Sequence, residues 1–300
     1  MPRRAVGRVG VTGAISSSGC PLMARSVPAT VTTILAATLA GAGAWPAAGQ
    51  RAADESLDRL LDLYVRDGLV YYRALRSERS VLDRYVLSLR EIPIGFDGWS
   101  TQQRIAFWLN GYNALVLRTV VNHYPIRGNS PQYPADSIRQ IPGAFERIRH
   151  TVAGMELTLD EIESSVLASF GDPRVFLALG RGAVGSGRLR SEAYSAARLG
   201  GQLAAAAEEF ATEPWGVVLD RSADTVRVSA IFGWRRAEFV LAYADRGWTD
   251  SGRSPLERAV LNLIEPSLFP SERAFLARNT FGFRYQDFDW RLNDLTGGRP

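Results

Sequence analysis

The stretch that decides the fold spans residues 100–125 and reads STQQRIAFWLNGYNALVLRTVVNHYP. Ser100 and Gln103 have the spacing of a capping box, so they predict the first turn of a helix. Pro125 cannot continue a helix and predicts its end. Between these limits the apolar residues recur at helical spacing, at Ile105, Trp108, Leu109, Tyr112, Val116 and Val120. We therefore expect a long helix with one buried face that includes Trp108.

Helix and strand signals alternate along the rest of the chain. Further helices are predicted over residues 77–90 and 199–210 and from the start signals at 158–161 and 254–257. Strands are predicted at 148–152, 155–158, 175–179, 217–219 and 226–229. This mixture is typical of an α+β fold, here a single compact domain of long helices packed on a small, mostly antiparallel sheet. We expect that domain to cover residues 52–294 and to be followed by a tail at 295–300.

The first 49 residues have the layout of a secretory signal peptide. Four arginines precede an apolar stretch at 31–44, and small residues follow at 42–44 and 47–49. The sequence therefore predicts export to the periplasm or the extracellular space, with a mature N-terminus between Trp45 and Ala53. Met1 and Met23 both remain open as the translation start.

Composition excludes several classes of function. The chain has no lysine, so a lysine Schiff base is excluded. Its one cysteine, Cys20, and its two histidines, His123 and His150, are too few for a zinc finger, an iron–sulfur site or a disulfide scaffold. We expect no metal and no cofactor.

Charge and hydropathy limit the partners. Residues 1–49 hold four arginines and no acid, so their removal leaves 31 basic against 31 acidic residues. No basic patch interleaved with aromatics remains, and no later apolar run reaches about 18 residues. We expect no nucleic-acid partner and no transmembrane span in the mature chain. A small anionic ligand or an envelope protein remains possible as a partner.

Several motifs occur in a recognisable order. They are AFWLNGYNAL at 106–115, NHYP at 122–125, LDEIE at 159–163, DPR at 172–174, LRSEAY at 189–194, VSAIFGW at 228–234 and FDWRLN at 288–293. Together they resemble the domain of unknown function family numbered 547 (DUF547), over about residues 68–294. The resemblance implies a shared fold but no established activity.

The chain departs from that family at four positions. Typical members carry a histidine in the segment after DPR, a cysteine at its end, a second cysteine before the LR segment, and often a histidine in the preceding helix. Here these positions hold Phe176, Arg181, Ser186 and Ser164. A cysteine and a histidine can act as nucleophile and base, and this chain has neither residue at these positions. The resemblance therefore favours a non-catalytic exported protein with a binding or scaffolding role in the cell envelope. The alternative is a hydrolase or acyl transferase in which Ser186 replaces the cysteine.

The glycine-rich segment around Ser186, GRGAVGSGR at 180–188, has three interpretations. It is an ordinary flexible surface loop, an anion-binding concavity that includes Arg181 and Arg188, or the site of a serine nucleophile. His123, at a helix end, is either a capping residue or a catalytic base for that serine.

Other polar residues also carry two interpretations each. Asn110 and Asn113 share one face of the long helix and either tie loops to the core or polarise a substrate carbonyl. Arg174 either braces a carboxylate such as Asp172 or clamps an anionic ligand. His150 is expected to be an exposed strand residue.

Overall fold

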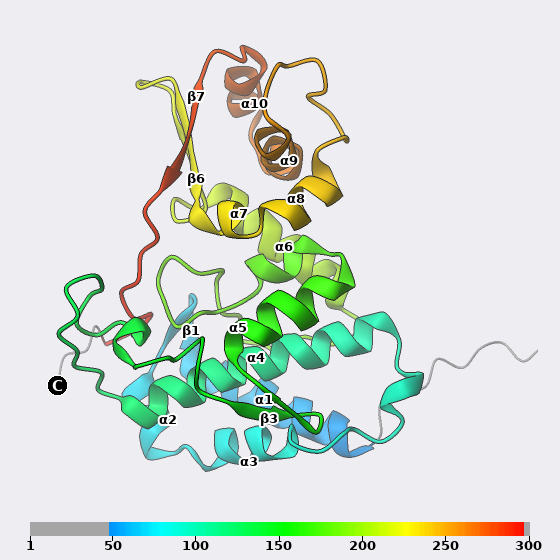
Figure 1. Ribbon diagram of the computed structural model, residues 1–300, viewed down its shortest axis with the longest axis vertical. Coiled ribbons are helices and arrows are strands. Elements are labelled where there is room, and N and C mark those ends of the chain that lie inside the picture. The colour runs from blue at the N-terminus through cyan, green and yellow to red at the C-terminus, as the bar shows by residue number, and fades with distance from the viewer. Residues whose placement is uncertain (1–47, 297–300) are drawn as a thin grey trace, which may run out of the picture. The chain divides into compact units, whose positions relative to one another are not determined.

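The structure, a computed structural model, describes residues 48–296 (Figure 1). The helices are α1 (Ala48–Tyr64), α2 (Tyr72–Ser77), α3 (Ser80–Ser88), α4 (Thr101–His123), α5 (Leu159–Glu161), α6 (Leu199–Thr212), α7 (Ala230–Trp234), α8 (Arg236–Tyr243), α9 (Pro255–Ile264) and α10 (Pro270–Ala277). The strands are β1 (Val65–Arg66), β2 (Leu69–Val70), β3 (His150–Val152), β4 (Met155–Leu157), β5 (Val217–Asp220), β6 (Thr225–Ser229) and β7 (Gly282–Gln286). Most of the predicted signal peptide, including Cys20, and the end of the predicted tail lie outside the described residues.

Helix α4 lies at the centre of the N-terminal half, in contact with α2, α3 and α5 (Figure 1). Its capping box forms as predicted, because Ser100 accepts from the backbone of Gln103 and Gln103 accepts from the backbone of Ser100. Its side chains are buried along almost the whole length from Ile105 to Val121, with Trp108 only 3% exposed. The predicted helix and the burial of its apolar residues are confirmed, but burial is not restricted to one face, because residues 105–117 are all buried.

The strands form three small sheets. Two are antiparallel hairpins, β1–β2 and β3–β4, and the third has the order β5–β6–β7. Within it β5 and β6 are antiparallel, while β7 pairs parallel to β6 in the register Val226 with Phe283 and Val228 with Tyr285. Helices α7 to α10 lie between β6 and β7 in the chain, as a parallel connection requires. The α+β prediction is confirmed, and β7 is the parallel exception to the antiparallel pairing.

Two local predictions were wrong, and one predicted helix is present with shorter bounds. The strand predicted at 175–179 is a 3₁₀ turn, Pro173–Leu177, because Asp172 caps it and Pro173 fixes its first turn. The helix predicted over 77–90 begins at Ser80 and is separate from α2. His150 is buried, because the hairpin that carries it hydrogen-bonds to the backbone at the end of α3. Burial lowers the pKa of His150 to about 4.

The segment after β7 returns to the start of the domain. Figure 1 shows this red segment running from the three-stranded sheet toward the N-terminal helices. There Val70 donates to the carbonyl of Asn293, at 2.8 Å, and Leu295 donates to the carbonyl of Val70, at 3.0 Å. The buried hydroxyl of Tyr72 donates to Asn293 Oδ1 at 2.8 Å. Residues 70–72 and 293–295, which are far apart in the sequence, therefore lie side by side.

None of the helices within residues 48–296 has the length and apolar character needed to cross a membrane.

Candidate ligand-binding cleft

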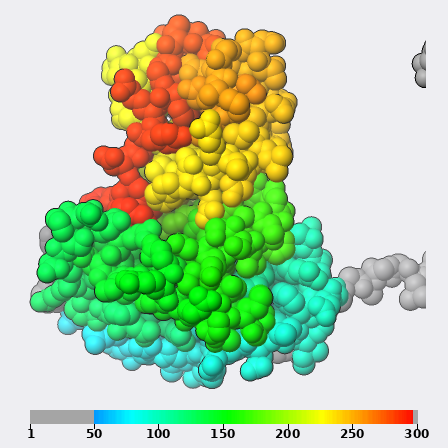
Figure 2. All heavy atoms as spheres, viewed as in Figure 1, coloured from blue at the N-terminus to red at the C-terminus, as the bar shows by residue number. Residues whose placement is uncertain are grey.

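A cleft of about 400 Å³ lies among segments that are distant in sequence. Figure 2 shows green, yellow and red segments meeting on this side of the molecule, and the residues of the cleft belong to segments of these three colours. Three arginines, two acids, three aromatics and a serine line it: Arg139, Phe145, Asp160, Glu163, Ser164, Arg181, Trp234, Arg235 and Trp290.

Glu163 is the centre of a buried ion network in the cleft. Arg181 donates from Nη2 to Oε1 at 2.6 Å and from Nε to Oε2 at 3.1 Å. Arg235 reaches Oε1 with Nη2 at 2.9 Å, and the hydroxyl of Tyr112 donates to Oε2 at 3.2 Å. Burial alone would raise the pKa of Glu163, but the charges and hydrogen bonds of Arg181 and Arg235 outweigh it and lower the pKa. The carboxylate is therefore ionised, with both oxygens occupied by protein groups.

Aromatic rings form one wall of the cleft. The ring centroid of Trp290 lies 4.4 Å from that of Phe288 and 6.0 Å from that of Trp234. The guanidinium of Arg139 stacks 4.7 Å above the Trp290 ring and 4.5 Å above the Phe145 ring. Trp234 is 47% exposed, so the wall has a free aromatic face. Such a wall combines flat apolar area with a cation.

Asp160 presents a second carboxylate to the cleft. It is half-buried, and its side chain makes no hydrogen bond or ion pair within residues 48–296. Burial, and next the charge of Glu146, raise the pKa of Asp160. The two acids of the cleft therefore differ, because Glu163 is held by the protein and Asp160 is accessible.

Ser186 lies beneath the cleft and does not line it. Its hydroxyl oxygen accepts from the backbone N–H of Arg181 at 3.0 Å, and the residue is 3% exposed. In the described part of the chain this is the only hydrogen bond of the Ser186 side chain, and it involves neither a histidine nor a carboxylate.

The glycine-rich segment is packed into the fold, which corrects the expectation of a flexible surface loop. Val184 and Gly185 donate to the carbonyls of Arg291 and Asp289, both at 2.9 Å. A Cβ on Gly187 would stand 1.8 Å from the carbonyl oxygen of Leu177, so no larger residue fits there without a shift. The segment therefore needs its glycines for close backbone contact.

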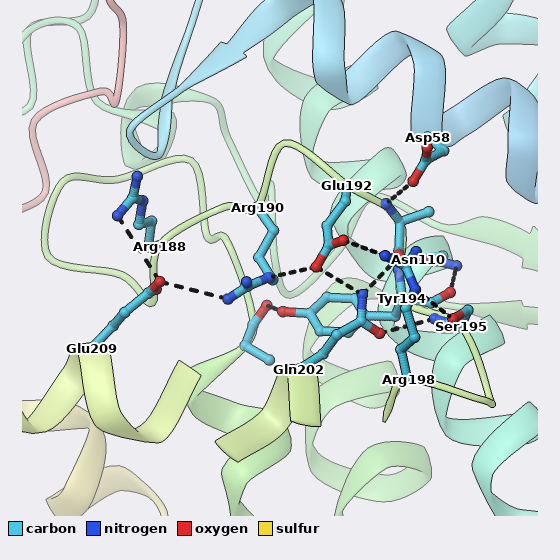
Figure 3. A network of polar contacts seen from close by, with 12 residues as sticks. Asp58, Asn110, Arg188, Arg190, Glu192, Tyr194, Ser195, Arg198, Gln202 and Glu209 are labelled. Carbon is cyan, nitrogen blue, oxygen red and sulfur yellow. Dashed lines mark hydrogen bonds and ion pairs between the residues drawn. The ribbon is translucent and has the colours of Figure 1, made fainter. Parts of the chain in front are cut away.

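The structure does not bring Arg181 and Arg188 together. Arg181 is buried on Glu163, whereas Arg188 donates to Asp67 at 2.6 Å and lies 3.9 Å from Glu209. Figure 3 shows Arg188 beside Glu209, within the network that ties the segment after the glycines to neighbouring helices.

Asn110 and Asn113 hold the same part of the chain from α4. Asn110 accepts from the backbone N–H of Tyr194 at 2.8 Å and donates to its carbonyl at 2.9 Å (Figure 3). Asn113 accepts from the backbone N–H of Gly180 at 2.9 Å and donates to the carbonyl of Ala178 at 3.4 Å. Both amides are buried and engaged with backbone groups, and neither residue lines the cleft.

Two remaining candidates also lie away from the cleft. Arg174 makes a two-pronged contact with Asp172, at 2.9 and 2.7 Å. His123 lies exposed at the end of α4, where its Nδ1 is 2.9 Å from the carbonyl oxygen of Thr119.

Sequence reasoning placed only Arg181 among the candidate residues of this cleft. It missed Asp160, Glu163, Arg139, Arg235 and the two tryptophans. Four of these missed residues lie within motifs that carried the family resemblance, LDEIE, VSAIFGW and FDWRLN. That recurrence was the signal that could have found them.

Within residues 48–296, no group of three or more histidine, cysteine or acidic residues is arranged to hold a metal ion.

Comparison with known proteins gives one match. The family described as "Protein of unknown function, DUF547" matches residues 96–211, from the start of the α4 region to the end of α6. Neither a curated protein nor a solved structure matches the chain. The matched segment contains Glu163, Arg181 and Ser186. The match confirms, over residues 96–211, the resemblance to the DUF547 family that the motifs indicate.

Proposed function

We propose that this protein is an exported, non-catalytic binding protein of the cell envelope that holds a small anionic ligand in the cleft described above. The observation that carries the proposal is the buried Glu163–Arg181 ion pair. The family resemblance places a cysteine at position 181, and here an arginine side chain occupies that space and pairs with Glu163 at 2.6 Å. The reactive thiol that the resemblance implies is thus replaced by a guanidinium group that binds Glu163 within the protein.

The surroundings of Ser186 support binding over the hydrolase or acyl-transferase alternative. A serine hydroxyl needs a general base within hydrogen-bond reach before it can attack a carbonyl. The Ser186 oxygen instead accepts from a backbone N–H, is buried, and is absent from the lining of the cleft. His123, the candidate base, bonds to the backbone of its own helix.

The lining of the cleft indicates the class of ligand. Three arginines and two acids line the cleft. Arg139 also pairs with Glu146, and Nη1 of Arg235 lies 3.7 Å from Oε1 of Glu238, so an anionic ligand would have to share these two arginines with protein acids. Trp234 and Trp290 offer flat surfaces beside Arg139. A volume of about 400 Å³ is that of a small-molecule site. The ligand we propose is a carboxylate attached to a ring, with the carboxylate on Arg139 or Arg235 and the ring on the tryptophans.

Calorimetric titration of the purified protein with benzoate tests this assignment, with benzyl alcohol as the neutral probe. We expect benzoate to bind and Arg139→Gln to weaken it by about tenfold, because a charge-assisted hydrogen bond is lost. Arg147→Gln is the matched control, since Arg147 is exposed and does not line the cleft. Equal binding of both probes, or equal effects of both substitutions, contradicts the assignment.

Two further measurements test the remaining parts of the proposal. Sequencing of the N-terminus of protein recovered from the cell envelope should give a start between Trp45 and Ala53, and an intact Met1 or Met23 would contradict export. A fluorophosphonate probe should leave Ser186 unlabelled. Labelling that disappears in Ser186→Ala would establish the catalytic alternative instead.

A further inference from the structure

A second, larger hollow lies against the first turns of α4. It has a volume of about 760 Å³, within the range of pockets that bind small molecules. Its walls come from the first turns of α1, the first turns of α4 and the segment 193–198. Figure 3 shows part of this region, including Asp58, Tyr194 and Arg198.

The deep wall of this pocket is apolar. Trp99, Phe107, Tyr194 and the neighbouring Ala106 of α4 are each less than a tenth exposed. Trp99 and Phe107 pack edge to face, with ring centroids 5.8 Å apart. The rings are fixed in place by these contacts, so the wall is a preformed surface for an apolar ring or chain.

Asp54 brings a carboxylate to this pocket, and it has no positive partner among residues 48–296. The hydrogen bond to its Oδ1 comes from the Gln50 amide, at 2.9 Å. Burial raises the pKa of Asp54 to about 6, and the groups that oppose the shift, on Gln50, Asn110 and Tyr85, are all neutral. Within residues 48–296, no arginine or histidine lies at ion-pair distance from Asp54.

The other charged groups of the pocket lie nearer to solvent or are already engaged. Arg51, Glu55 and Arg59 are exposed. Asp58 accepts from the backbone N–H of Ala193 at 2.9 Å. Arg198, also exposed, pairs with Glu192 at 2.6 Å. Asp54 is therefore the acid of this pocket that lacks a counter-charge within the part of the chain that the structure describes.

We propose that this pocket binds a small organic cation, an apolar ring or chain that carries a protonated amine, with the amine on Asp54. A charge in partly apolar surroundings is stabilised when it is paired, and the ammonium group supplies the charge that the protein does not. The apolar body gains by leaving water for the wall of Trp99, Phe107 and Tyr194. This site is separate from the cleft and independent of its proposed ligand.

Three probes with similar bodies and different charges test the proposal by titration of the full mature chain. They are 2-phenylethylamine, 2-phenylethanol and 3-phenylpropanoate. We expect the amine to bind about tenfold or more tightly than the alcohol, and the carboxylate to bind most weakly. Equal affinity for the three probes, or no detectable binding of the amine, overturns the proposal.

Substitutions locate the site. Asp54→Asn should abolish the preference for the amine, while Asp62→Asn, the same change at an exposed position of α1, should retain it. Ala197 is exposed and lines the pocket, so Ala197→Trp should weaken all three probes without disturbing the core. An unchanged preference in Asp54→Asn, or unchanged binding in Ala197→Trp, excludes this pocket as the site. Failure of benzoate to bind the cleft has no bearing on this result.

Discussion

The cleft and the larger pocket hold their buried carboxylates in opposite ways. In the cleft, Glu163 has two arginines and a tyrosine hydroxyl, and its pKa is lowered. In the larger pocket between α1, α4 and residues 193–198, called the α1 pocket from here on, the partners of Asp54 among residues 48–296 are neutral. Burial raises the pKa of Asp54 to about 6. A carboxylate that the protein pairs internally belongs to the scaffold, whereas an unpaired one remains available to a ligand. The accessible acid of the cleft is accordingly Asp160.

Helix α4 contributes to both hollows. Its first turns line the α1 pocket, and Tyr112, further along the same helix, donates to Glu163. The amides of Asn110 and Asn113 hold the segment 178–194, which contains Arg181 of the cleft and Tyr194 of the α1 pocket. Differences between the hollows therefore arise from their charged residues and not from separate scaffolds, and substitutions at those residues test the comparison directly.

The largest expected effect is that of Arg181→Met. Removing one partner of a buried ion pair leaves the other charge undercompensated, so we expect unfolding free energy to fall by about 3 kcal/mol or more. Arg174→Met is the matched control, because its pair with Asp172 is half-exposed and such pairs contribute about 0–1 kcal/mol. Urea titration of both variants measures the difference. Equal losses would show that the Glu163 network is not a structural ion pair.

The pH dependence of stability should have opposite signs in the two hollows. The folded-state pKa of Asp54 is raised from 3.8 to about 6, so its contribution is complete below pH 3.8 and is lost as pH rises through about 6. Asp54→Asn should therefore gain stability relative to the parent protein by about 1–2 kcal/mol at pH 8, and the gain should shrink toward pH 4. Urea titrations between pH 4 and pH 8 measure it.

Glu163 provides the counterpart in the same titrations. Its folded-state pKa is below the ordinary value of 4.5, so the stability it contributes is present above pH 4.5 and is lost as pH falls further. A parent protein and an Asp54→Asn variant with parallel pH profiles would remove the distinction between the two carboxylates.

The smallest expected effect is that of Ser186→Ala. The hydroxyl is buried and accepts from the backbone N–H of Arg181, so its removal leaves a buried donor without a partner. We expect a loss of about 1–2 kcal/mol in urea titration, larger than the roughly 0.5 kcal/mol of a surface-loop change. Ser164→Ala, at an exposed position, is the control. No loss beyond the control would place the Ser186 hydroxyl outside the network that supports the cleft.

Sequence patterns predicted the elements that are determined by residues close together in the chain. The capping boxes at Ser100, Thr158 and Ser254 and the apolar periodicity of α4 depend on neighbouring residues, so they could be identified from the chain alone. The parallel pairing of β7 with β6 could not, because it is decided by the packing of four intervening helices.

The candidate site was less predictable for the same reason. Arg181 and Glu163 are 18 residues apart, and Arg235 joins them from 72 residues beyond Glu163. Their pairing depends on the tertiary fold, so spacing along the sequence carries no sign of it. The burial of the glycine-rich segment could not be predicted either, because this segment hydrogen-bonds to the backbone of residues 289 and 291, which are distant in the sequence.

The contact between residues 68–72 and the segment around Asn293 bears on how the chain is completed in time. A polypeptide is made from its N-terminus, and 221 positions separate Tyr72 from its partner Asn293. Until that partner has been synthesised, the hairpin that contains Val70 lacks its hydrogen bonds to the C-terminal segment. The family segment 96–211 contains neither side of this contact. During synthesis the folding chain therefore lacks this contact until Asn293 has been added, and a chain whose translation stops before Asn293 cannot form it.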